Sequence, residues 1–286
     1  MKSTRSEFDL ADVAMSAVVV IWATNNVFTK AVLPEIAPLA FIWARFAIVT
    51  PSLFAWLIAR RRLELPRRAD WPLFLVSGAC GFGFYNVLFI LGIDRTSAFA
   101  AALLLSLNPT ITMLFASLLR IERGPPAQWL GAALATGGVA LFVGESLRSD
   151  SPGAMAGNLM LVLGSVCFAV YSLSARSLVV TYGVQSTTAW SLLVGIAMLT
   201  PLAAQSVAAE NWLTLSAAVW AALLYAALIS LLLSYIIWAW AIARRGVTRS
   251  AAYLFLLPVV TGIFSAWLIG ERFGPLQIAG AALVLG

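Results

Sequence analysis

The chain is a succession of long apolar runs separated by short charged connections. Ten such runs can be marked, and no connection is long enough to form a soluble domain. Hydrophobic residues make up 62% of the chain and charged residues 10%, whereas a soluble domain has about 45–50% apolar and about 25% charged residues. A run of roughly 20 apolar residues matches the hydrocarbon thickness of a bilayer. We therefore expect the chain to fold inside a membrane.

Helices are the expected form of these runs, because backbone polar groups in lipid must be paired within the structure. The runs are continuous, so they do not fit the alternating ten-residue strands of a membrane barrel. The last run is about 12 residues long, too short to span a bilayer, and we expect it to continue beyond Gly286. The expected helices lie roughly at 12–33, 38–59, 71–93, 97–119, 127–144, 157–180, 185–207, 215–243, 248–269 and 275–286.

The distribution of Lys and Arg indicates an orientation. If the N-terminus is cytoplasmic, twelve of the 18 cations lie on the cytoplasmic side and three on the other side. This bias is the positive-inside pattern of plasma-membrane proteins. It places both termini in the cytoplasm, with the cations facing lipid headgroups rather than nucleic acid, and we expect a multi-pass protein of a bacterial inner membrane.

An internal repeat divides the chain. Residues 109–137 and 258–286, which are 149 positions apart, share 13 identities in 29 positions, including the Glu-Arg pairs at 122–123 and 271–272. A shift of 146 aligns the first helix of each half, with Trp22 on Phe168 and Lys30 on Arg176. Five helices are an odd number, so the second copy enters the membrane from the opposite side. We therefore expect an all-α integral membrane protein with ten transmembrane helices in two inverted-topology five-helix repeats, residues 1–150 and 151–286. Such repeats are a recurring architecture of secondary transporters.

Three motifs carry a family resemblance: "IWATNNVFTK" at 21–30, "ARFAIVTP" at 44–51, and the repeated Pro…Glu-Arg…Pro…Gln…Gly phrase. With them the chain resembles the EamA-type members of the drug/metabolite transporter superfamily, and most of all its amino-acid exporters, including those for aromatic amino acids. The resemblance implies a central cavity lined by helices 1, 3, 4, 6, 8 and 9, with helices 5 and 10 peripheral. The first helix of the second half departs from the pattern, since Phe168 replaces Trp and Arg176 replaces Lys.

Three cations lie inside the apolar runs: Lys30, Arg45 and Arg176. Arg45 lies about eight residues into its run, roughly 10–12 Å deep at 1.5 Å per residue. A charge at the bilayer centre costs about 2.5–3.5 kcal/mol on insertion scales. No acidic residue lies at a comparable depth, so Arg45 must contact backbone carbonyls, water or an anionic ligand. Lys30 and Arg176 are near helix ends, where they either bind substrate or extend to the headgroups.

Polar and aromatic side chains on the runs assigned to the cavity are the other candidates for substrate binding. Buried hydroxyls and amides need partners, although each of these residues could instead serve packing or lie at the membrane interface. Pro109 and Pro258 are equivalent in the two halves and are expected to bend their helices beside the cavity, as hinges or as packing kinks. The remaining candidates are Trp22, Asn25, Asn26, Tyr85, Asn86, Asn108, Tyr171, Tyr235, Trp238 and Tyr253.

These features predict a secondary transporter that exports small amphipathic metabolites, above all aromatic or other neutral amino acids, by alternating access. There are two alternatives: an exchanger of organic anions or sugar phosphates on the same fold, and a non-transport membrane protein. No nucleophile–base pair or paired carboxylates occur at membrane depth, so we expect no enzyme. The chain has no histidine and only two cysteines, so we expect no metal and no cofactor. We expect facilitated or uncoupled transport by a monomer or homodimer.

Overall fold

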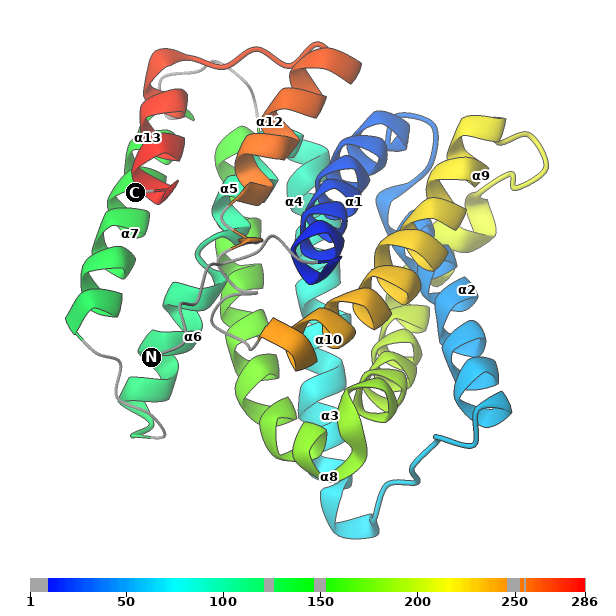
Figure 1. The fold of residues 1–286 in the computed structure, drawn as a ribbon. Helices are drawn as coiled ribbons and strands as arrows, with labels where there is room; N and C mark the ends of the chain where they lie inside the picture. Colours follow the sequence, from blue (N-terminus) through cyan, green and yellow to red (C-terminus); the bar gives the residue numbers. More distant parts are fainter. Residues whose placement is uncertain (1–9, 121–125, 147–152, 246–252, 255, 286) are drawn as a thin grey trace.

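A computed structural model describes residues 10–120, 126–146, 153–245, 253–254 and 256–285, and all regular structure in these ranges is helical (Figure 1). The elements are α1 (Leu10–Val32), α2 (Pro38–Ala59), η1 (Arg68–Asp70), α3 (Trp71–Gly78), η2 (Ala79–Phe84), α4 (Tyr85–Arg95), α5 (Ala98–Leu105), α6 (Asn108–Leu118), α7 (Pro126–Ser146), α8 (Ala154–Ala209), α9 (Ala217–Leu224), η3 (Tyr225–Leu233), α10 (Ser234–Arg245), α12 (Leu256–Leu268) and α13 (Pro275–Leu285).

Each of the ten predicted runs corresponds to a helix or to consecutive helices in the described ranges. Six stretches are long and apolar enough to cross a membrane, again within the described residues. The longest of them, α8, contains two of the predicted runs. They are separated at Gly183, whose φ of 73° and ψ of 163° are not helical. A positive φ is accessible to glycine at little cost, so the chain turns there.

The fourth predicted run is not one helix. It is divided at Ser106 and Leu107 into α5 and α6, and Pro109 is the second residue of α6. Proline lacks the N–H that would continue the hydrogen bonding of the preceding turn, and it is well suited to a first helical turn. The helix is thus interrupted just before Pro109, and a role of this residue as a hinge stays a prediction. Pro258 is the third residue of α12, and residue 255 just before that helix lies outside the described ranges.

Two π-helical stretches, η2 and η3, interrupt the third and eighth runs, although no sequence pattern indicated them. They begin at Ala79 and Tyr225, positions related by the same offset that aligns the first helices of the two halves. In a π-helix each N–H bonds to the carbonyl five residues back, and such stretches occur frequently at functional sites. The two halves therefore carry the same irregularity at equivalent positions.

The fifth helix of each half, α7 and α13, packs against the other at one margin of the molecule (Figure 1). A Cβ atom on Gly280 of α13 would lie 2.5 Å from the carbonyl oxygen of Gly138 on α7. Small residues allow helices to approach this closely in a membrane. The Gly-Ala segments of these helices thus pack within the fold, and both helices are peripheral as the resemblance implied.

The series α3–η2–α4 of the first half packs along α8 of the second half. One close approach is between Gly92 and Gly157, where a Cβ on either residue would come within about 3 Å of the other's carbonyl oxygen. This contact brings helices from both halves together around the centre of the molecule.

The connections between helices gather at two ends of the bundle (Figure 1). The upper end, as we name it, holds the connections at 33–37, 96–97, 210–216 and 269–274, and there the backbone N–H of Ala37 donates to Glu210 Oε2 at 3.1 Å. The lower end holds the connection at 60–70 and the turn at Gly183. At the lower end the backbone N–H of Arg67 donates to the Tyr182 hydroxyl at 3.0 Å, and that hydroxyl donates to Asp70.

Candidate functional site: a central polar and aromatic cavity

A cavity of about 460 Å³ lies at the centre of the bundle. All six runs that the resemblance assigned to the cavity contribute to its wall, and the second run adds Arg45 and Phe46 from α2. A volume in this range fits a small-molecule ligand. The predicted residues that line it are Trp22, Asn25, Asn26, Arg45, Tyr85, Asn86, Asn108, Pro109, Tyr171, Tyr235 and Trp238.

Four predicted residues do not line this cavity: Lys30, Arg176, Tyr253 and Pro258. Lys30 Nζ donates to the carbonyl oxygens of Ile93 at 2.9 Å and Asp94 at 2.7 Å, at the last turn of α4. Arg176 is exposed on α8. The Tyr253 hydroxyl donates to Asp12 Oδ1 at 3.0 Å. The expectations for Lys30 were substrate binding or extension to the headgroups. In the structure its ammonium instead binds carbonyl oxygens at the end of α4.

Arg45 is the cation of the cavity wall. It is 7% exposed, and its Nε donates to the carbonyl oxygen of Ala226, in η3, at 3.2 Å. Among the residues that the structure describes, no partner is found for its two Nη groups. Tyr85 and Tyr235 lie near enough to interact electrostatically with the guanidinium, and no Asp or Glu is found in the described wall. The predicted carbonyl contact is present, and donors remain for an anionic ligand.

Aromatic rings form two walls around Arg45. On one wall the ring centroid of Trp22 lies 5.4 Å from that of Trp238 and 6.0 Å from that of Tyr235, which joins α1 to α10. On the other wall Phe168 of α8 lies 5.5 Å from Tyr85 and 5.7 Å from Tyr171. Such walls offer flat apolar faces with polar edges, which suits an amphipathic ligand.

The π-helical stretches position several of these groups. Trp22 Nε1 donates to the carbonyl oxygen of Ser230 at 3.0 Å, and the hydroxyls of Thr24 and Tyr225 lie 2.7 Å apart. Asn86 Nδ2 donates to the Gly81 carbonyl, five residues back, at 3.0 Å. The first two contacts attach α1 to η3, and the third fixes the Asn86 amide on η2. The irregular backbone of both stretches therefore lies beside the cavity, which is where a membrane protein tolerates such backbone.

Two amide oxygens of the wall are buried without a hydrogen-bond partner in the described structure: Asn25 Oδ1 and Asn108 Oδ1. A buried polar group left unpaired costs about 1–3 kcal/mol. Buried polar groups without a partner need an explanation. One explanation is a bound ligand that donates hydrogen bonds to these oxygens.

Several wall residues were not predicted from the sequence. Phe168 occupies the position equivalent to Trp22 under the 146-residue shift, so the repeat could have identified it. Gly81 and Phe82 lie in the glycine-rich stretch that forms η2. For the others no local signal distinguishes a wall residue from an ordinary apolar helix residue: Phe46, Phe89, Ala102, Leu105, Ser106, Ser230, Leu231, Leu254 and Leu257.

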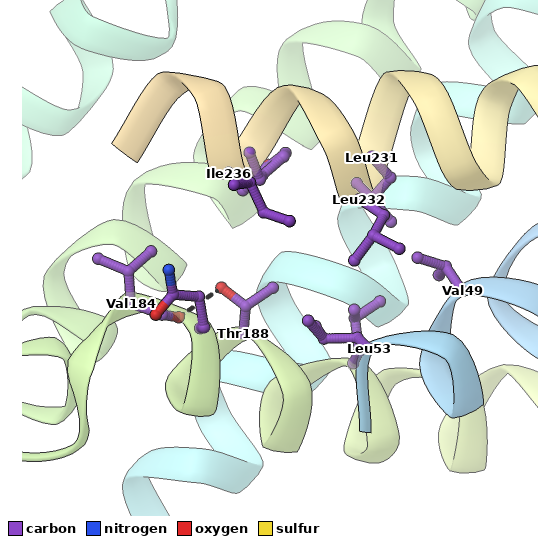
Figure 2. A pocket seen from close by; sticks show the side chains of 10 residues that line it. Val49, Leu53, Val184, Thr188, Leu231, Leu232 and Ile236 are labelled. Atoms are coloured by element: carbon purple, nitrogen blue, oxygen red, sulfur yellow. Dashed lines mark hydrogen bonds between the residues drawn. The ribbon is translucent and has the colours of Figure 1, made fainter. Parts of the chain in front are cut away.

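A second pocket lies between α2, α8 and the η3–α10 series, and Figure 2 shows its side chains. Its wall is mostly apolar, with Val49 and Leu53 facing Leu232 and Ile236. Its volume is only about 20 Å³, which is room for about one water molecule. We therefore assign the ligand site to the central cavity. No cluster of three or more His, Cys, Asp or Glu residues able to hold a metal ion is found in the part of the chain that the structure describes.

Comparison with known proteins decides the family. The model of the EamA-like transporter family matches twice, at residues 9–144 and at 155–286. The chain belongs to the EamA-like transporter family. It is thus a multi-pass integral membrane protein of a transporter family rather than an enzyme, and the two matches indicate a duplicated helical repeat.

Relatives of this EamA-like chain cover between three quarters and nearly all of its length. An "Uncharacterized transporter" of Archaeoglobus fulgidus is 27% identical, with 90% of this chain and 89% of that protein covered. A "Probable amino-acid metabolite efflux pump" of Salmonella typhimurium is 28% identical, with 94% and 90% covered. A "Probable terminal-alkyne amino-acid exporter" of Streptantibioticus cattleyicolor is 28% identical, with 76% and 72% covered.

One solved crystal structure has the same fold as this EamA-like chain. Its TM-score is 0.66 at 18% sequence identity, and 98% of this chain and 94% of the other are covered. At this identity the likeness concerns the fold alone.

Proposed function

We propose that this protein exports small amphipathic metabolites, above all aromatic and other neutral amino acids, across the bacterial inner membrane. The observation that carries the proposal is the central cavity, which combines one buried cation, free amide oxygens and two aromatic walls. Relatives named as amino-acid exporters support the same substrate class.

The carboxylate of the substrate binds at Arg45. The Nη groups of this side chain have no partner in the described structure, and no Asp or Glu of the described wall competes for them. An ionic hydrogen bond of this kind contributes about 1.5–3 kcal/mol. A guanidinium also matches the flat geometry of a carboxylate.

The ammonium and the side chain of the substrate contact the remaining wall. Asn25 and Asn108 offer amide oxygens as acceptors. The indole face of Trp22 beside Trp238 provides apolar surface and a site for cation–π contact. A zwitterion with an apolar side chain uses all three kinds of group.

The alternative substrate, a sugar phosphate, fits the cavity less well. Phosphate recognition favours several cations at one place, whereas Arg45 is the cation found in the described wall, and Lys30 and Arg176 lie elsewhere. The same wall contains no carboxylate able to carry a proton, which supports movement without proton coupling.

Alternating access between the two inverted five-helix halves moves the substrate, with ten helices crossing the membrane and both termini in the cytoplasm. The arginine-rich connection at 60–70 supports an orientation with the lower end of the bundle on the cytoplasmic side. The upper end then faces outward.

Uptake of labelled phenylalanine and leucine into proteoliposomes tests the proposal, with protein-free liposomes as the control and with and without an imposed pH gradient. We expect saturable flux that does not respond to the gradient. Phenylpropionate, which lacks the ammonium, should compete weakly. Exchange of sugar phosphates without any amino-acid flux would contradict the proposal.

A further inference from the structure

The upper end of the bundle is held together by one carboxylate that joins the two halves. Glu271 lies between α12 and α13 of the second half, and both of its oxygens accept from the first turn of α5 in the first half. The backbone N–H of Ala98 donates to Oε1 at 2.7 Å, and that of Phe99 donates to Oε2 at 3.3 Å. An acceptor here satisfies amides that lack a partner in the helix, and its charge is favourable at a helix N-terminus.

Glu271 is fixed to α12 by the backbone. Gly270 turns the chain with a φ of 69°, and the Glu271 N–H donates to the Ser265 carbonyl at 3.2 Å. Two residues later Phe273 packs on Phe99, with ring centroids 4.4 Å apart. Any separation of the upper ends of α12 and α5 must therefore break the carboxylate contact and this ring contact together.

A second ionic contact strengthens the same corner. Lys30 Nζ binds the last carbonyls of α4, just before α5 begins, where a cation is favourable. The Lys30 ammonium and the Glu271 carboxylate also attract each other. Together these charges hold α1, α4, α5 and α12 in contact at one place.

Below this corner the same region of the bundle borders the cavity. α5 contributes Ala102 to the cavity wall, and α6, which follows the break, contributes Asn108 and Pro109. Leu254 and Leu257, at the opposite end of the α12 region from Glu271, line the cavity as well. The corner therefore lies between the cavity and the connections of the upper end.

We propose that Glu271 is the latch of the outer gate: its contact with α5 holds the cavity closed to the outside, and its release is needed for substrate to leave. Glu271 contacts no substrate and acts by positioning α5 against α12. The role as a gate rests on the proposed transport function, but the closure itself can be measured without any substrate.

Cysteine accessibility tests this proposal. Ala102→Cys, in the cavity wall on α5, is introduced after Cys80 and Cys167 are replaced by Ala. A membrane-impermeant maleimide is then applied from outside to cells or oriented vesicles. We expect slow labelling with Glu271 present and at least several-fold faster labelling in Glu271→Ala. Glu271→Gln, which keeps an acceptor oxygen, should be intermediate.

Two control variants separate a latch from a general weakening of α5. Ser97 caps the same helix by accepting from the Ala100 N–H at 2.9 Å, but it belongs to the same half as α5. Glu35 is an exposed carboxylate at the same end of the bundle. Labelling in Ser97→Ala and Glu35→Ala should match the parent protein. Equal labelling in Glu271→Ala and its parent, or the same increase in Ser97→Ala, would overturn the proposal.

The result is independent of the transport test. If Glu271→Ala fails to fold, as judged by gel filtration, Glu271→Gln supplies the comparison. Faster outside labelling without amino-acid flux in any variant would support the latch and reject the amino-acid substrate. Amino-acid flux in the parent protein, with unchanged labelling in both Glu271 variants, would support the amino-acid substrate and reject the latch.

Discussion

Arg45 combines features that are rarely found together in a membrane: a permanent charge, nearly complete burial, and one described hydrogen bond to a backbone carbonyl. At this depth the side chain is expensive unless it meets a partner. The Ala226 carbonyl supplies one contact, and we propose that the substrate carboxylate supplies the others. The residue therefore offers a direct test of the substrate class.

Replacing Arg45 with Met should raise the half-saturating concentration for phenylalanine at least about tenfold, since an ionic hydrogen bond is worth about 1.5–3 kcal/mol. The melting temperature should stay the same or rise, because apolar replacement of a buried charge is often neutral or stabilising. Flux assays over a concentration series measure the first effect. Arg95→Met is the control, because Arg95 bonds the Leu91 carbonyl outside the cavity. An unchanged half-saturating concentration in Arg45→Met would remove Arg45 from the site.

Glycine contacts determine how closely the helices of the two halves approach one another. A Cβ on Gly157 would lie 2.9 Å from the Gly92 carbonyl oxygen and 3.0 Å from Arg95 Cβ. A backbone atom cannot move aside as a flexible side chain can, so α4 and α8 must separate to accept a methyl group. The cavity lies between these helices and others, so its shape depends on the contact.

Gly157→Ala should lower the melting temperature in detergent, because overpacking a tight contact costs about 1–3 kcal/mol. Gly137→Ala is the matched control: apart from the backbone of its own helix α7, no described atom lies within 4 Å of the added Cβ. That variant should be neutral or more stable, since Ala is favoured over Gly in a helix by about 1 kcal/mol. Thermal unfolding followed by gel filtration compares the two. Equal stability of both variants would show that α4 and α8 are not held as closely as described.

The two ends of the bundle should face opposite sides of the membrane. Leu65, in the arginine-rich connection of the lower end, is 71% exposed, and Leu213, at the upper end, is 97% exposed. Both side chains are accessible, and neither lines the cavity. They are therefore suitable reporters of orientation.

Single cysteines at these positions, in the background lacking Cys80 and Cys167, should label differently in intact cells. An impermeant maleimide should reach Leu213→Cys at once and Leu65→Cys only after the membrane is permeabilised. The reverse pattern would mean that the positive-inside argument gives the wrong orientation, and the latch at Glu271 would then face the cytoplasm.

Much of this protein follows from the sequence, because a bilayer restricts what an apolar chain can do. Backbone groups in lipid must be paired, so ten apolar runs predict helices at those positions, and the structure has helices there. The internal repeat indicated two equivalent halves, in agreement with the two family matches. Eleven candidate residues, including Trp22, Arg45 and Tyr235, lie in one cavity wall, because polar groups in apolar helices turn toward the protein interior.

Tertiary structure decided what periodicity and composition do not encode. The π-helical stretches η2 and η3 contact helices that are far apart in the sequence, α8 for η2 and α1 and α2 for η3. Lys30 contacts the end of α4 rather than the cavity, since a neighbouring helix presents free carbonyls at that position. The Glu-Arg phrase at 271–272 was recognised as a repeat, but its contact with α5 lies 173 residues away in the chain. In a bilayer, the apolar composition of a segment is enough to make that segment a helix. The contacts between residues on distant segments are decided only when the folded helices pack together.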